Sequence, residues 1–290
     1  MSVQIVIDSA CDLPKRTADE LGLHFVSMRT LFDGVEYLDG VTLTGPEFYQ
    51  KLIESDVLPT TSQVPPADFE EIFEKIVSQG DTALCITVSS RLSGTYQSAN
   101  IAAQAFGDRV IVIDSENVTV GEQLLVLRAV QLQKQGWSAW EMAEILNHEK
   151  KQIRLIALLD TLEYLKKGGR ISSATAAVGT LLNIKPILHL TTGKLESYKK
   201  ARGMNKACEV MLESIRSDLA IRFQEAHARG DVFLLAAGSA DKQTTAKWLK
   251  QIETAFPGMP IQYDDLSMGV SCHTGEGALG IGLSVRPKIK

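Results

Sequence analysis

The segment Ser89–Ala99, which reads SSRLSGTYQSA, stands between an apolar run and a helical pattern. The run Ala83–Val88 has strand character, and apolar residues recur at helical spacing from Tyr96 onward. A strand is therefore predicted to end in a polar turn that opens a helix near Ser93-Gly94. The first N–H groups of such a helix lack intrahelical partners and lie at the positive end of its dipole, which suits a carboxylate or phosphate. Serine is also a common helix cap, so Ser93 is either a cap or part of an anion site.

Two further apolar runs each end in the dipeptide Asp-Ser. They are Val3–Ser9 and Val110–Ser115, and together with Ala83–Val88 they are typical of buried parallel strands joined by helices. Ligands of such sheets bind beyond the carboxyl ends of the strands, so we expect the polar residues to gather at one edge. Two roles are open for Asp8 and Asp114 there, ligand contact and ordinary turn or cap chemistry.

Composition sets the class of protein. The chain has 290 residues, of which 44% are hydrophobic and 22% charged, which is ordinary for a globular protein of two domains. A net charge of -5 argues against a nucleic-acid binder. No apolar run reaches the roughly 20 residues of a membrane span, and the N-terminus enters a strand pattern without a basic leader. The four scattered cysteines fit a reducing compartment, so a cytoplasmic location is expected.

The rest of the chain predicts a second, mixed α/β domain. We place the N-terminal domain at residues 1–152 and the C-terminal domain at residues 153–290, with a ligand site between or within them. The predicted C-terminal elements are a strand at 154–159, a short helix stopped by Gly168-Gly169, a helix over Ala174–Leu182, a hairpin turning at Thr192-Gly193, a long helix over Met204–Arg229 and strand–helix–strand patterns to the end. The fold class is thus α/β, with a parallel doubly wound sheet in the first domain.

Two segments carry further polar candidates. Pro59–Pro66 holds three adjacent hydroxyls between prolines, which makes it either a rigid donor-bearing loop or simply a loop. His273 follows Cys272 in a glycine-rich stretch that we expect to be a loop, where a histidine is either a bystander or a ligand. The chain has no HxxxH, HExxH or CxxC spacing, so no metal is expected.

An ordered series of motifs along nearly the whole chain resembles the DegV family. The motifs are Ile7-Asp8-Ser9 with Asp12-Leu13-Pro14, Thr61-Ser62-Gln63, the segment at 89–99, Asp114-Ser115, Tyr164 to Ile171, Lys185 to Leu188, Lys200 to Gly203 and His273-Thr274-Gly275. The resemblance implies a two-domain α/β protein that binds one long-chain fatty acid. It also implies that a separate fatty acid kinase turns the bound acid into an acyl phosphate for phospholipid synthesis. The chain would then be a carrier and not an enzyme.

The resemblance also implies roles for single residues. Those that would hold the carboxylate are Thr61, Ser93, Gly94 and His273. Those with a secondary role or a place near the mouth are Ser62, Asp8, Ser9, Arg170, Arg202 and Thr274. The sequence departs from the family pattern at Val64, where the family has the proline of Thr-Ser-Gln-Pro-Ser-Pro, and at Glu276, which replaces the proline of His-Thr-Gly-Pro-Gly. Glu276 adds negative charge near the expected anion and bears on carboxylate affinity.

Two other functions would use the same residues. Ser93 as nucleophile with His273 as base would make an esterase or thioesterase, although the chain lacks the Gly-x-Ser-x-Gly elbow and an assigned acid. The same hydroxyls and His273 would also suit a small polar metabolite such as a hydroxyketone. For the carrier, the expected partners are the fatty acid and its kinase, with no cofactor, no nucleic acid and no integral membrane segment.

Overall fold

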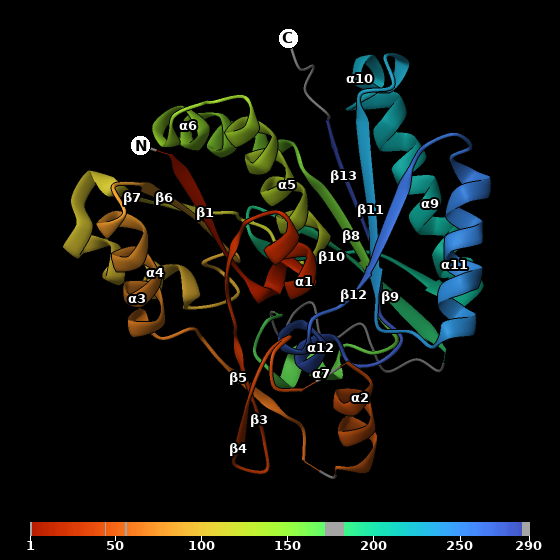
Figure 1. Cartoon of the computed structure of the whole chain (residues 1–290). Coiled ribbons are helices and arrows are strands. Elements are labelled where there is room, and N and C mark those ends of the chain that lie inside the picture. Colours follow the sequence, from red (N-terminus) through yellow and green to blue (C-terminus); the bar gives the residue numbers. More distant parts are fainter. Residues whose placement is uncertain (1, 44, 56, 172–182, 286–290) are drawn as a thin grey trace. The chain divides into compact units, whose positions relative to one another are not determined.

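The structure is a computed structural model that describes residues 2–43, 45–55, 57–171 and 183–285 (Figure 1). Contacts group the chain into two compact units. The first contains the residues up to Lys151, together with Thr192–Lys194 and Ser267–Cys272. The second contains Gln152–Thr191, Leu195–Leu266 and the residues from His273 onward. The helix predicted over 174–182 lies outside the described residues.

A four-stranded parallel sheet forms the centre of the first unit. Its order is β2 (His24–Val26), β1 (Val3–Asp8), β6 (Thr82–Thr87) and β7 (Val110–Asp114). Ile5 of β1 lies opposite Leu84 of β6, and both are fully buried. The apolar runs are continuous because both faces of this sheet are covered, as in parallel sheets generally.

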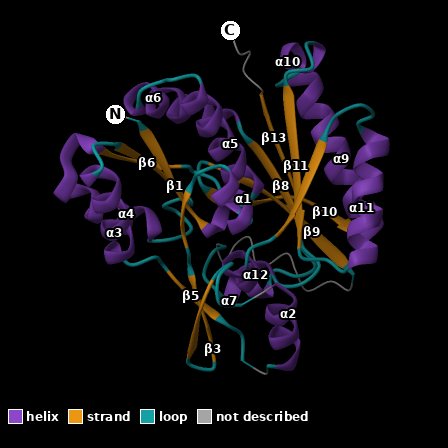
Figure 2. Ribbon diagram, in the orientation of Figure 1, coloured by secondary structure: helices purple, strands orange, loops and turns teal. Residues whose placement is uncertain are grey.

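Helices cover both faces of the parallel sheet (Figures 1 and 2). On one face lie α3 (Pro66–Ser78) and α4 (Thr95–Ala103), and on the other lie α5 (Val120–Lys134) and α6 (Ala139–Glu149). The short α1 (Lys15–Glu20) follows Pro14 and packs beside β2. This arrangement confirms the predicted doubly wound α/β architecture.

A small antiparallel sheet also belongs to the first unit. Its order is β4 (Val35–Leu38), β3 (Arg29–Phe32) and β5 (Thr60–Ser62), and α2 (Gly45–Glu54) lies between β4 and β5 in sequence. The sequence predicts a loop at Thr60–Ser62, and this is wrong. These residues form β5 because they pair with β3, with Thr61 opposite Thr30. Such long-range pairing overrides a local composition that is typical of a loop.

The second unit is built on a six-stranded mixed sheet. Its order is β10 (Lys194–Arg202), β9 (Ile184–Thr191), β8 (Arg154–Leu158), β13 (Leu279–Val285), β11 (Val232–Gly238) and β12 (Ile261–Asp265). Only the β11–β12 pair is parallel among the registers that the described residues define. The turn Thr192-Gly193 has positive φ at both residues, 47° and 79°, as a two-residue hairpin turn requires. The mixed C-terminal fold and its hairpin are thus confirmed.

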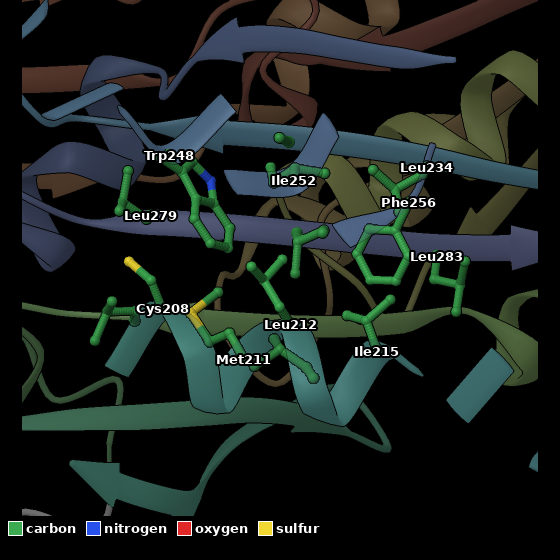
Figure 3. Packing of buried hydrophobic residues seen from close by; sticks show 14 of the residues in the cluster. Cys208, Met211, Leu212, Ile215, Leu234, Trp248, Ile252, Phe256, Leu279 and Leu283 are labelled. Atoms are coloured by element: carbon green, nitrogen blue, oxygen red, sulfur yellow. The ribbon is translucent and has the colours of Figure 1, made fainter. Parts of the chain in front are cut away.

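Two amphipathic helices bury their apolar faces against this sheet (Figure 3). Met211 and Ile215 of α9 (Met204–Ile221) meet Trp248 and Ile252 of α11 (Lys242–Ala255) in one core. The sequence predicts a single helix to Arg229, and this is wrong. The chain breaks after α9, with Phe223 in the core, and resumes as α10 (Gln224–Ala228).

Besides three 3-10 helices, at Ser9–Cys11, Gln104–Arg109 and Lys150–Gln152, the described chain has two more short α-helices. They are α7 (Glu163–Lys167), which belongs to the second unit, and α12 (Met268–Thr274). His273 lies on the last turn of α12, so the predicted loop at this position is wrong. Among the described residues, no helix combines the length and apolar character that a bilayer span needs.

Candidate functional site

The carboxyl ends of β1, β6 and β7 are joined by side-chain hydrogen bonds. Asp8 accepts hydrogen bonds from the N–H of Ala10 at 2.9 Å and of Val88 at 2.8 Å. Asp114 accepts one from the N–H of Ser90 at 3.1 Å. The expected gathering of these polar residues at one sheet edge is confirmed. Asp8 is fully buried, and burial raises its pKa to about 7 despite the two N–H donors. Its contacts are those of turn and cap chemistry.

Ser93 and Gly94 lie in the turn between β6 and α4. The carbonyl of Ser89 accepts hydrogen bonds from the N–H groups of Leu92 and Ser93, which closes the turn. The Ser93 hydroxyl lies 2.9 Å from the Thr95 hydroxyl and accepts a hydrogen bond from the Thr95 N–H at 3.3 Å. Gly94 is the N-cap residue and has no side chain that could cap the helix. The preceding Ser93 instead accepts the N–H of Thr95, the first residue of α4, so its hydroxyl makes a capping contact at the start of this helix.

The segment that follows β5 packs on this same turn. The Gln63 amide donates to the Ser98 hydroxyl at 2.9 Å, and the Val64 N–H donates to the Thr95 hydroxyl at 3.3 Å. A Cβ added to Gly94 would lie 1.8 Å from Oε1 of Gln63, so the Gln63 amide would have to move to admit it. The structure thus brings the Thr61–Ser62 strand end and the Ser93–Gly94 turn together within the first unit.

Thr61 is also linked to the end of α12. Directly opposed residues of an antiparallel pair project to the same face, so Thr61 and Thr30 are neighbours on one side of the small sheet. The Thr30 hydroxyl lies 3.9 Å from the Cys272 sulfur, and Cys272 directly precedes His273. Thr30, Thr61 and Cys272 all belong to the first unit.

In the second unit, His273 lies against the end of α7. A Cβ added to Gly168 would lie 2.3 Å from Nδ1 of His273, so the imidazole occupies the space that any other residue would need. Burial, with a smaller contribution from the Arg170 guanidinium, lowers the pKa of His273 to about 4. The ring is therefore neutral near pH 7 and offers one N–H donor and one acceptor.

Three further predicted site residues lie in different surroundings. Ser9 is buried, and its hydroxyl donates to Asp39 and accepts the N–H of Met28. These bonds stabilise the edge of the sheet. Arg170 lies beside His273 and donates to the Gly168 carbonyl at 2.6 Å. Arg202 is exposed at the end of β10.

The last predicted residues follow in the chain around His273 and Thr61. Thr274 ends α12, with its hydroxyl 3.4 Å from the Gly275 carbonyl, and Ser62 is exposed at the end of β5. A Cβ at Gly275 would lie 2.4 Å from the Tyr164 ring, which fixes the loop on α7. Burial and then the Glu276 carboxylate raise the pKa of Tyr164, so the departure at Glu276 places a charge near this loop.

The sequence predicts the Thr95 hydroxyl beside the start of α4, but it assigns no role to Gln63 or Thr30. Gln63 follows two predicted site residues, so its position in the motif could have marked it. Thr30 carries no local signal, because only the strand register brings it opposite Thr61. No cluster of metal-ligating side chains occurs within the described part of the chain.

Comparison with known proteins gives consistent matches over the whole chain. The family profile described as "Uncharacterised protein, DegV family" matches residues 2–286. A "DegV domain-containing protein" of Deinococcus radiodurans is 34% identical over 283 residues, which are 98% of each chain.

Solved structures show the same similarity. One from Thermus thermophilus, described as fatty acid binding of a DegV family protein, has a TM-score of 0.88 and 34% identity and covers 98% of this chain and 100% of its own. The Bacillus subtilis DegV structure, described as a fatty acid binding protein, has a TM-score of 0.86 and 28% identity and covers 98% of this chain and 99% of its own.

Proposed function

The chain belongs to the DegV family, and from this premise we propose that it binds one long-chain fatty acid. In this proposal the hydroxyls of Ser93 and Thr61, the backbone at Gly94 and the ring of His273 hold the carboxylate. The observation that carries the proposal is the turn at Ser93, where the Ser93 and Thr95 hydroxyls and the start of α4 lie together beside the Thr61–Gln63 segment.

The chemistry of these groups suits a carboxylate held without a buried counter-charge. Hydroxyls and helix N–H groups donate hydrogen bonds that are strengthened by the negative charge of the acceptor. They also avoid the large desolvation cost of burying a second ion. His273 fits this scheme, because its lowered pKa keeps the ring neutral, so it adds no second buried charge.

Most of the affinity is expected from the acyl chain. Each buried methylene contributes about 0.8 kcal/mol, so a 16-carbon tail contributes roughly 12 kcal/mol before the costs of association. Affinity should therefore rise about fourfold for each added methylene until the cavity is filled, because 1.4 kcal/mol corresponds to a factor of ten.

We further propose that the bound acid is presented to a separate fatty acid kinase in the cytoplasm. Arg170 beside His273 is the best-supported contact for the phosphoryl group or for the kinase, and Arg202 is a second cation for the same role. Acyl phosphate should form from ATP only when kinase, carrier and fatty acid are combined. Replacement of Arg170 by Gln should slow that reaction more than it weakens fatty acid binding.

The lowered pKa of His273 favours binding over hydrolysis. A general base works best with a pKa near the operating pH, and a pKa of about 4 makes His273 a weak base. The carrier is therefore proposed to have no catalytic activity of its own.

Calorimetric titration of the delipidated chain with hexadecanoic acid tests the proposal. The Ser93→Ala and Thr61→Ala variants should each bind several-fold more weakly, because each loses a donor to the carboxylate. Thr254→Ala is the matched control, since its exposed hydroxyl only bonds the Lys250 carbonyl on α11. Equal affinity of the wild type and both site variants would mean that Ser93 and Thr61 do not bind the carboxylate. Hydrolysis of a short acyl ester that Ser93→Ala abolishes would favour the esterase instead.

A further inference from the structure

Two aspartates of the first unit bind the start of α12 from far away in the sequence. Asp12 accepts a hydrogen bond from the N–H of Ser267 at 2.8 Å. Asp39 accepts one from Met268 at 3.0 Å through Oδ1 and one from Gly269 at 3.1 Å through Oδ2. The first N–H groups of α12 are thus satisfied by side chains about 230 to 255 positions away, and not by a local cap.

Asp39 is itself held in a fixed position. It is 2% exposed, and its Oδ2 also accepts a hydrogen bond from the Ser9 hydroxyl at 3.0 Å. That hydroxyl in turn accepts the Met28 N–H at 3.0 Å. A Cβ at Gly269 would lie 3.2 Å from Oδ2 of Asp39, so the helix backbone and the carboxylate are in direct contact. Three donors on one carboxylate leave it little freedom to move.

Further contacts follow along the same helix. The Ser271 hydroxyl lies 2.8 Å from the Tyr49 hydroxyl, and the Cys272 sulfur lies beside the Thr30 hydroxyl. A helix of seven residues is too short to be stable by itself, so α12 depends on these tertiary contacts for its conformation. His273 lies on the last turn of this helix.

We propose that Asp39, together with Asp12, is a positioning residue for the carboxylate site, acting through the first turn of α12 on His273. This inference rests on the proposed function, because His273 is taken there as a ligand of the carboxylate. In this inference Asp12 and Asp39 do not contact the fatty acid, and they position His273, which does.

Three variants of the full-length chain test this inference. Asp39→Asn keeps the volume of the side chain but puts an amide donor where the carboxylate accepts N–H groups. Asp12→Asn likewise replaces the carboxylate that accepts the Ser267 N–H, and it provides the test if Asp39→Asn does not fold. Asp241→Asn is the matched control, because Asp241 caps α11 in the same way by accepting from Gln243 at 2.9 Å and Thr244 at 3.0 Å.

Two readouts are compared in the delipidated variants. The first is the dissociation constant for hexadecanoic acid, and the second is the NMR signal of the His273 ring, assigned by its loss in His273→Gln. We expect Asp39→Asn and Asp12→Asn to weaken binding by about fivefold, the equilibrium equivalent of one lost helix cap, and to shift the His273 signal. Asp241→Asn should lower the melting temperature and leave both readouts unchanged.

The outcomes separate the inference from the proposed function. Wild-type affinity and an unshifted His273 signal in both aspartate variants would overturn the positioning role while fatty acid binding stands. If the wild-type chain itself fails to bind hexadecanoic acid, the proposed function has failed. The His273 signal then still decides whether the two aspartates position the ring.

Discussion

The end of the Gln63 side chain lies directly against Gly94. A Cβ there would lie 1.8 Å from Oε1 of Gln63, whose amide donates to Ser98. This contact joins the end of β5 to the turn before α4, two proposed carboxylate-binding segments of the first unit.

Replacement of Gly94 by Ala should weaken hexadecanoic acid binding and lower the melting temperature, because the Gln63 amide must move away from the turn and lose its hydrogen bond to Ser98. Gly94→Ala combined with Gln63→Ala should recover part of both losses. Gly45→Ala is the control, since nothing lies within 4 Å of a Cβ there. Tight binding by Gly94→Ala alone would show that this contact does not shape the site.

Asp8 should make stability fall as the pH rises. Its pKa is raised from 3.8 to about 7 by burial, so the folded state holds a proton that the unfolded state has already lost in this range. The unfolding free energy of the wild type should therefore fall, relative to that of Asp8→Asn, as the pH rises from 3.8 to about 7. Urea unfolding at several pH values measures it. A difference that is constant across the range would mean that Asp8 is ionised throughout.

His273 should titrate far below an ordinary histidine. Its pKa is lowered from 6.5 to about 4 by burial and then by Arg170, so NMR should follow its protonation near pH 4. The stabilising effect of the neutral ring is complete above pH 6.5 and is lost as the pH falls toward 4. Arg170→Gln should raise this pKa, because the nearby positive charge is removed. Protonation of His273 near pH 6.5 in the wild type would contradict the half-buried, neutral ring.

Glu276 should weaken carboxylate binding slightly. The side chain is exposed, so water and salt screen its charge, and Glu276→Gln should tighten hexadecanoic acid binding by no more than about twofold at low salt. Glu253→Gln on α11 is the control for a general change in net charge. Weaker binding in Glu276→Gln would instead assign this carboxylate a favourable role.

Much of the fold could be predicted from the sequence because its signals are local. The apolar runs that form β1, β6 and β7 are buried on both faces and therefore continuous, which distinguishes them from half-exposed strands. The hairpin at Thr192-Gly193 was predictable as well, because glycine readily adopts the positive φ that such a turn needs.

The elements that the sequence did not predict depend on distant partners. β5 exists because Thr61 pairs with Thr30, and the hydroxyl-rich sequence alone resembles a loop. The acceptors at the start of α12 come from the distant Asp12 and Asp39. The sequence around His273 therefore contains no local signal that predicts a helix. The break after α9 arises because Phe223 turns into the core, which helical periodicity cannot show.

The candidate site divides in the same way. Ser93 and Gly94 were predictable from a strand, turn and helix that adjoin in the chain. The environment of His273 was not, because its neighbour Gly168 is more than a hundred residues earlier and only the fold brings the two together.

Mass spectrometry of the chain purified gently from cells, first native and then denatured, tests the central claim most directly. The account predicts one long-chain fatty acid bound to each chain, lost or reduced in a Ser93→Ala/Thr61→Ala variant. A chain that is empty and also takes up no added fatty acid would contradict it, and would leave the binder of a small polar metabolite as the better account.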